Sequence, residues 1–241
     1  MIVSKVMCDV RDGPSDAALN DLRMPVGINV DALVELMYNR SMGASLRFYL
    51  YLLHHMNDEH RLRDTVASLA SITGYCSLAR GIKLLRKHGF IDVYHKTSRS
   101  TSVFIPNLWF TDTESAVPGT RFLVFDDKVM ELLTIYPSGT YMSVFAYLVQ
   151  QAQMMSVDED TEFLVYTLGR VRVQDEMNFG YVTVVNAVHA LASLGLIRIV
   201  HVPGVRHMSY VISPKVVRIA DDNGTAQYMD SARAYKRLLV F

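Results

Sequence analysis

The stretch GYCSLARGIKLLRKHGFI, residues 74–91, returns later in the chain as GYVTVVNAVHALASLGLI, residues 180–197. Both copies begin with Gly-Tyr, end with Gly, an apolar residue and Ile, and stand 106 positions apart. Within each copy the apolar residues follow the spacing that marks one face of a helix. These residues are Leu78, Ile82 and Leu85 in the first copy and Val184, Val188 and Leu191 in the second. A repeated supersecondary unit constrains the fold more strongly than any single motif.

The repeat continues upstream with an offset of 96 positions. Asp31, Glu35, Leu36, Gly43, Tyr51 and Leu52 are matched by Asp127, Glu131, Leu132, Gly139, Tyr147 and Leu148. The offsets of 96 and 106 differ by ten, so the second copy is expected to carry one insertion of that size. The acidic segment SVDEDTE, residues 156–162, is polar and is predicted to form this insertion as a surface loop.

Bulk composition limits the classes of protein that this chain can represent. Its 241 residues and the duplication favour two domains of roughly 110 residues each. Because 24 basic residues balance 24 acidic ones, a polybasic tail, an acidic arm and a nonspecific nucleic-acid coat are disfavoured. Half of the residues are apolar, which is enough for each domain to bury a core.

The cysteines and the lengths of the apolar runs indicate the cellular compartment of the protein. Neither Cys8 nor Cys76 belongs to a CxxC or Cys/His ligand pattern, so a reducing interior is the default. No apolar run approaches the roughly 20 residues of a membrane span. The first residues also lack the long apolar stretch of a secretory signal. We therefore expect a cytoplasmic protein with no membrane partner.

The first copy has the pattern of helices followed by a β-hairpin. Helices are predicted over residues 46–56, from Thr65, and over 78–88, where Gly89 ends the helix. The period then changes to two, with a polar tip at residues 96–102. Helix, helix, turn, helix and hairpin is the order of a winged helix-turn-helix, in which the hairpin is the wing.

The second copy repeats this order after a polar linker. Its predicted elements are a strand (122–125), helices (128–133, 141–154, 170–178 and 182–194) and a hairpin (196–212). The expected fold class is mainly α with small β-hairpins (α+β), arranged as two tandem winged helix-turn-helix domains. The expected organisation is a flexible N-terminal lead-in (1–25), winged-helix domain 1 (26–110), a linker (111–120), winged-helix domain 2 (121–215) and a C-terminal tail that can form a short helix (216–241).

Basic residues concentrate in the first copy at the positions that meet DNA in such domains. Between residues 61 and 99 there are eight basic and two acidic residues, a local net charge of +6. Arg80 points away from the predicted core and can make a bidentate contact to guanine, whereas Lys83 suits a phosphate. The candidate DNA-binding residues of this copy are Ser77, Arg80, Lys83, Arg86, Lys87, Lys96 and Arg99. The alternative interpretation is a solvated charged face.

The second copy has a weakly charged equivalent. Its window of residues 167–207 carries four basic and two acidic residues, a net charge of +2. Thr183 and Asn186 lie on the outer helix face, where Asn186 can read adenine, while the hairpin residues Arg206 and His207 can enter a minor groove. The alternative is that this copy packs against a protein, with Val182 and Val185 helping to form an apolar contact.

Motifs of enzymes are missing from the sequence. It contains no Gly-rich phosphate loop, no GxSxG, no HExxH and no paired carboxylates in a recognisable frame. His54 and His55 lie on an apolar helix and are better explained as core or surface residues than as metal ligands. We therefore expect no enzymatic activity, no catalytic residues, no metal and no cofactor.

The chain resembles the winged-helix replication initiators of plasmids and phages, several of which contain two tandem winged helices. The resemblance lies in SLASITGYCSLARGIKLLRKHGFIDV (68–93) and, in the second copy, in FLVF, SGTYMSVFAYLVQ and NAVHALASLGLI before a glycine-containing wing. It implies sequence-specific binding of double-stranded DNA, as a replication initiator or transcription regulator, with a homodimer or replication and transcription proteins as further partners. The competing hypothesis is a non-enzymatic assembly subunit whose tandem winged helices bind proteins.

Overall fold

The structure is a computed structural model, and contacts divide the chain into two compact units. The first unit lies within Ala44–Asn107, and the second within Met24–Gly43 and Leu108–Phe241. The described residues are 26–38, 42–73, 78–96, 101–158, 161–167, 169–200, 207–221 and 226–228. In these ranges the fold combines helices with three small antiparallel sheets, which confirms the α+β class.

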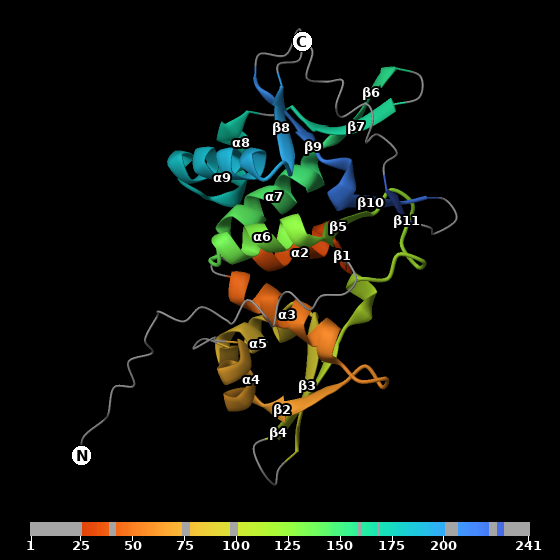
Figure 1. Cartoon of the computed structure of the whole chain (residues 1–241), viewed down its shortest axis with the longest axis vertical. Helices are drawn as coiled ribbons and strands as arrows, with labels where there is room; N and C mark the ends of the chain where they lie inside the picture. Colours follow the sequence, from red (N-terminus) through yellow and green to blue (C-terminus); the bar gives the residue numbers. More distant parts are fainter. Residues whose placement is uncertain are drawn as a thin grey trace, which may run out of the picture. The chain divides into compact units, whose positions relative to one another are not determined.

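The first unit consists of a helix, a strand, two helices and a β-hairpin (Figure 1). Its elements are α3 (Gly43–His55), β2 (Leu62–Thr65), α4 (Val66–Thr73), α5 (Leu78–Lys87), β3 (Ile91–Lys96) and β4 (Thr101–Pro106). The strands pair antiparallel in the order β2-β4-β3. The helices and the hairpin lie where the periodicity predicts them, but the short strand β2 was not expected, because LRDT has no clear period-two pattern.

Aromatic side chains of α3 form the centre of the first unit's core. Phe48 packs edge-on against Phe104 of β4, with ring centroids 5.6 Å apart. Tyr49 packs in the same manner against Phe90, at 5.1 Å, and its hydroxyl donates to the backbone oxygen of Asn107 at 2.8 Å. All four rings are fully buried, so α3 holds the hairpin through both packing and a satisfied polar group.

The second unit contains the same order of elements with one strand added. Its elements are α7 (Thr140–Gln151), β6 (Gln153–Asp158), β7 (Thr161–Tyr166), α8 (Arg170–Met177), α9 (Tyr181–Ser193), β8 (Ile197–Val200) and β9 (Ser209–Ile212). Their sheet has the order β6-β7-β9-β8, so β7, β9 and β8 correspond to β2, β4 and β3 of the first unit.

The two hairpins have the same strand register at the offset seen in the sequence. Ile91 pairs with Pro106 across β3 and β4, and Ile197 pairs with Ile212 across β8 and β9. Each member of the second pair lies 106 positions after its counterpart. Register follows the side-chain pattern of the strands, so equal register means that this pattern is repeated in the two hairpins.

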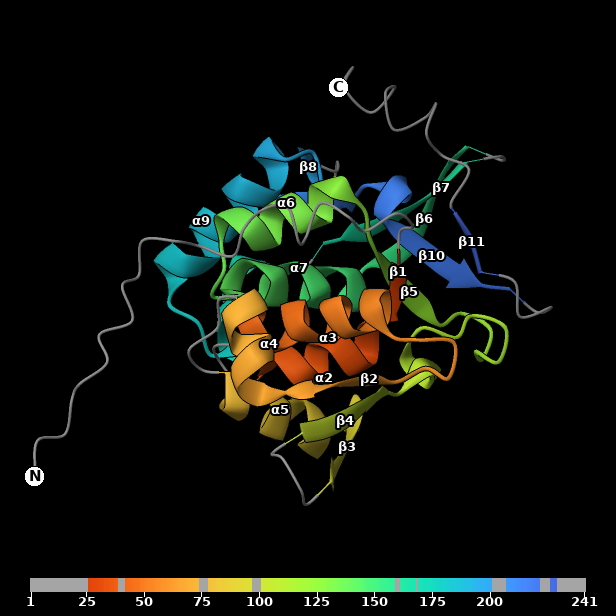
Figure 2. The ribbon, with the colours of Figure 1, turned by 60° about the horizontal axis from the view of Figure 1, so that its bottom comes forward.

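A further sheet in the second unit pairs the strand that begins the first copy of the repeat with the equivalent strand of the second copy (Figure 2). Val26 pairs with Phe125 and Asn29 with Phe122. Phe122 is the repeat equivalent of Val26, and Phe125 is that of Asn29, because each lies 96 positions later. The two equivalent strands therefore pair with each other, antiparallel. The elements of this region are β1 (Val26–Asn29), α2 (Val30–Tyr38), η1 (Leu108–Phe110), β5 (Arg121–Phe125), α6 (Asp127–Ile135), η2 (Pro214–Val216), β10 (Val217–Ala220) and β11 (Ala226–Tyr228).

Long-range pairing places several segments differently from the sequence-based expectation. Residues 26–43, expected in the first domain, belong to the second unit because β1 pairs with β5. Residues 217–220, expected in a tail, form β10, which pairs with β5 on its other side. Residues 226–228, expected in the same tail, form β11, and the residues after Tyr228, where the tail can form a short helix, lie outside the described ranges.

The described residues of the acidic insertion, 156–158 and 161–162, lie in two paired strands and not in the predicted surface loop. Helix α7 ends at Gln151, since Ala152 has an extended backbone with ψ of 146°, and the predicted extension to Met154 is therefore wrong. β6 then pairs with β7, with Ser156 opposite Glu162. The ten additional residues thus supply an extra edge strand to the sheet.

Candidate nucleic-acid interface

Helix α5 separates an apolar inner face from a cationic outer face. Leu78, Ile82 and Leu85 are buried, as their helical spacing predicts. Four outward side chains of α5 are positively charged and exposed: Arg80, Lys83, Arg86 and Lys87. Among the described residues, none of these four cations forms an ion pair or a side-chain hydrogen bond. The helix therefore presents four charges to solvent that no described residue compensates.

Two acidic residues that precede this helix in the sequence, Glu59 and Asp64, are engaged locally. Asp64 accepts hydrogen bonds from the Thr65 amide at 2.6 Å and the Ser68 hydroxyl at 3.1 Å, at the start of α4. Glu59 lies 3.5 Å from Arg61 in an exposed pair. Because exposed pairs contribute little, Arg61 keeps most of its ability to meet another anion.

The structure describes only part of the predicted DNA-binding set. It brings the four cations of α5 onto one helix. Lys96 is the last residue of β3, next to the hairpin tip, but its side chain is not described. Ser77, Arg99 and Arg206 lie outside the described residues, as does the predicted Gly74-Tyr75 turn.

Helix α9, the counterpart of α5, has no charged residue in its sequence YVTVVNAVHALAS. Val184, Val188 and Leu191 are fully buried, at the positions equivalent to the buried face of α5. Asn186 is exposed as predicted, whereas Thr183 is half-buried. The start of the helix instead exposes Tyr181 and Val182.

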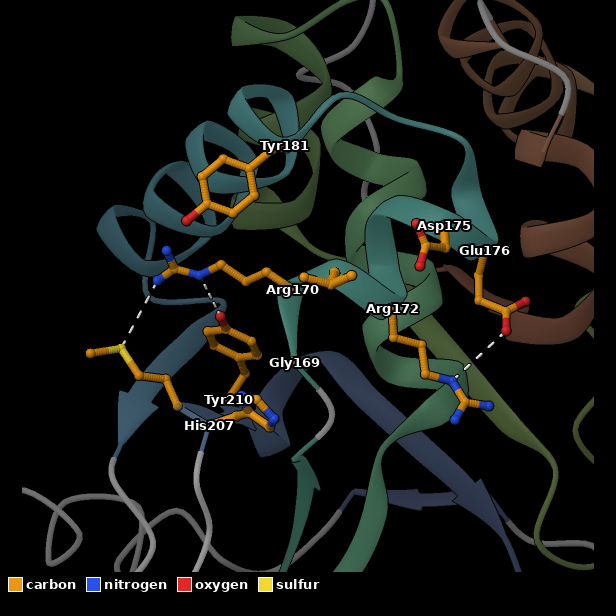
Figure 3. Close-up of a pocket in the computed structure, with 10 residues that line it drawn as sticks. Gly169, Arg170, Arg172, Asp175, Glu176, Tyr181, His207 and Tyr210 are labelled. Atoms are coloured by element: carbon orange, nitrogen blue, oxygen red, sulfur yellow. Dashed lines mark hydrogen bonds and ion pairs between the residues drawn. The ribbon is translucent and has the colours of Figure 1, made fainter.

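A shallow depression opens beside the start of α9, and sequence reasoning did not identify it (Figure 3). Its volume is about 760 Å³. The residues that line it come from the first two turns of α8, the start of α9 and the region where β9 begins. They are Gly169, Arg170, Val171, Arg172, Asp175, Glu176, Tyr181, His207, Met208 and Tyr210. Because these residues are spread over 42 positions, no local motif points to them.

Arg170 is held in a fixed orientation within this depression. Its Nε donates to the Tyr210 hydroxyl at 2.8 Å, and its Nη2 lies 3.9 Å from the Met208 sulfur. The Tyr210 ring is buried and stacks on the buried ring of Tyr166, with centroids 6.0 Å apart. The hydrogen bond to Tyr210 is the main reason that the pKa of Arg170 is raised, which favours its charged form.

The described part of the chain contains neither a candidate metal site nor a candidate membrane-spanning helix. Within the described ranges, His, Cys, Asp and Glu side chains nowhere form a group of three or more able to hold a metal ion. His55 stacks on Tyr51, and His54 meets His55 edge-on, so these histidines pack as aromatic rings. No helix among the described residues has both the length and the apolar character needed to cross a membrane.

A comparison with models of known protein families finds no match, and a comparison with curated protein sequences finds no significant relative.

Proposed function

We propose that the chain is a sequence-specific double-stranded DNA-binding protein built from two tandem winged helix-turn-helix domains. The order of helix, strand, two helices and hairpin, repeated with equal hairpin register, supports this assignment. In the proposal α5 is the recognition helix that enters the major groove, and the hairpin β3–β4 is the wing that lies on the phosphate backbone.

The observation that carries the proposal is the cationic outer face of α5. Arg80, Lys83 and Lys87 recur at intervals of three and four residues, so they lie along one stripe of the helix. Arg80, nearest the N-terminus, suits a bidentate contact to guanine, and the lysines suit phosphates. Four exposed cations without partners among the described residues retain their full charge for an external polyanion.

Selection from a random pool of duplexes with the full chain tests the proposal. We expect enrichment of a defined site, and the double variant Arg80→Ala with Lys83→Ala should bind that site about tenfold more weakly or worse. The matched control, Lys128→Ala with Lys215→Ala, removes the same charge from two exposed lysines outside α5 and should keep the affinity. Unchanged affinity and salt dependence in the α5 variant would overturn the proposal.

The arrangement of selected sites distinguishes the two processes that the proposal includes. Direct repeats favour a replication initiator of the plasmid or phage type, because such repeats load several copies in one orientation. Palindromic half-sites favour a dimeric transcription regulator, since the symmetry of the site mirrors that of the protein.

A second candidate function is a non-enzymatic assembly subunit that uses its winged helices as a protein-binding platform. The uncharged α9, which exposes Tyr181 and Val182, favours this candidate. A stable complex with a protein, combined with no affinity for any duplex at low salt, would support the platform and exclude the DNA-binding proposal.

A further inference from the structure

We infer that the depression between α8 and α9 of the second unit binds a peptide segment of another protein, through an apolar side chain flanked by a carboxylate. The inference is independent of DNA binding by α5. It concerns a different unit and a different class of partner, so each proposal can fail without the other.

Exposed apolar side chains define the first part of this site. Val171, Tyr181 and Met208 are 61%, 53% and 54% exposed, and all three line the depression. They come from α8, from α9 and from the segment before β9, so the tertiary structure gathers them at one place. Apolar side chains gathered on a surface mark protein contacts, because burial of this area is favourable.

Arg170 supplies the second part, a charged donor group already in position. Tyr210 and Met208 hold its guanidinium, and no carboxylate among the described residues forms an ion pair with it. Figure 3 shows the guanidinium beside Tyr181, while Asp175 and Glu176 lie on the other side of α8. A guanidinium has five N–H donors in a planar fork that matches a carboxylate, so spare donors remain for an incoming acid.

The charges around the depression favour a peptide over a nucleic acid. The lining carries no net charge, because Arg170 and Arg172 are balanced by Asp175 and Glu176, and Arg172 lies 3.8 Å from Glu176 in an exposed pair. Asp175 and Glu176 repel a continuous phosphate backbone, and α9 adds no positive charge. A single carboxylate can reach Arg170 without approaching these acids. Arg, Tyr and Met are also the residue types enriched where proteins bind proteins.

A random dodecapeptide library displayed on phage and selected on the immobilised full chain tests the inference. We expect the enriched peptides to pair Leu, Ile, Phe or Met with Asp or Glu within two positions. The most enriched peptide, made synthetically, should bind Val171→Asp about tenfold more weakly. The matched control is Val117→Asp, which introduces the same charge at a valine that is 73% exposed and does not line the depression.

Reversing the charge at Arg170 tests whether this side chain contacts the acid of the peptide directly or only maintains the structure of the site. Arg170→Glu should weaken the acidic peptide about tenfold and favour a version in which the acid is replaced by lysine. If loss of the Tyr210 contact unfolds this variant, Val171→Asp remains decisive, because an exposed side chain can be changed without disturbing the core. The inference would be overturned if the same peptides were enriched on Val171→Asp as on the parent chain. Enrichment of basic peptides, or of no peptides, would overturn it too. It would also be overturned if Val171→Asp weakened only duplex DNA binding.

Discussion

Gly43 and Gly139, which occupy equivalent positions of the repeat, lie against each other in the second unit. A Cβ atom placed on Gly139 would lie 2.6 Å from the Gly43 nitrogen, and one placed on Gly43 would lie 2.7 Å from the Gly139 nitrogen. The Gly43 amide also donates to the Ser138 oxygen at 3.3 Å. Both glycines are therefore required where residue 43 and the start of α7 approach each other within the second unit.

The first prediction concerns this contact. Gly139→Ala should lower the free energy of unfolding by about 2 kcal/mol or more, because the alanine must adopt a φ of +80° and also overlap Gly43. Urea denaturation measures the change. Gly119→Ala is the matched control, since Gly119 has a φ of +84° but nothing within 4 Å of its would-be Cβ. Equal losses in the two variants would contradict the steric argument.

The second prediction concerns the start of α6. Asp126 is the N-cap residue, and its side chain accepts from the Val129 amide at 3.0 Å. Asp126→Ala should cost about 1 kcal/mol of stability, because that amide loses its partner. Asp127→Ala removes a neighbouring acid from the first turn without removing the cap and should cost only a few tenths of a kcal/mol. A thermal-unfolding comparison that ranks them in the reverse order would count against this role.

The third prediction concerns the salt dependence of the proposed DNA binding. Lys83→Ala with Lys87→Ala should reduce the slope of log affinity against log salt concentration by about two, since each phosphate contact contributes about 0.9. Fluorescence anisotropy between low and moderate salt measures the slope. Lys128→Ala should leave it unchanged, and an unchanged slope in the α5 variant would show that these lysines do not meet phosphates.

The fourth prediction concerns pH and Tyr49. Burial raises the pKa of the Tyr49 hydroxyl above its ordinary value of 10.0. In the unfolded chain this hydroxyl loses its proton near pH 10, whereas in the folded chain it stays protonated to higher pH. The associated stability is therefore fully present below about pH 10 and is lost as the pH rises further.

Tyr49→Phe tests this linkage and the hydrogen bond together. The variant should lose about 1 kcal/mol at neutral pH, since the Asn107 oxygen loses its donor. Its stability should then fall less steeply above pH 10 than that of the parent chain. Tyr94→Phe is the control, because Tyr94 is exposed and folding leaves it in water. Parallel pH profiles for the parent and Tyr49→Phe would contradict the proposed linkage.

Sequence alone was sufficient for features that depend on local spacing. The three-and-four periodicity predicted α5 and α9 with their buried faces, and Gly89 and Gly195, which both have positive φ, end the equivalent segments. Period two predicted the hairpins. The outward direction of Arg80 and Lys83 followed from the same periodicity, because a helix converts spacing into direction without help from the rest of the fold.

Only the tertiary structure decided where short strands pair and which distant side chains meet. Strands of four residues such as β1, β2 and β10 carry too little local pattern to select a partner, and their place depends on the edge that is available. Arg170 meets Tyr210 across 40 positions because β7 and β9 pair. The repeat and the contrast in charge between its two copies were visible in the sequence, but the depression beside α9 required the structure, since its lining comes from separate elements that only the fold brings together.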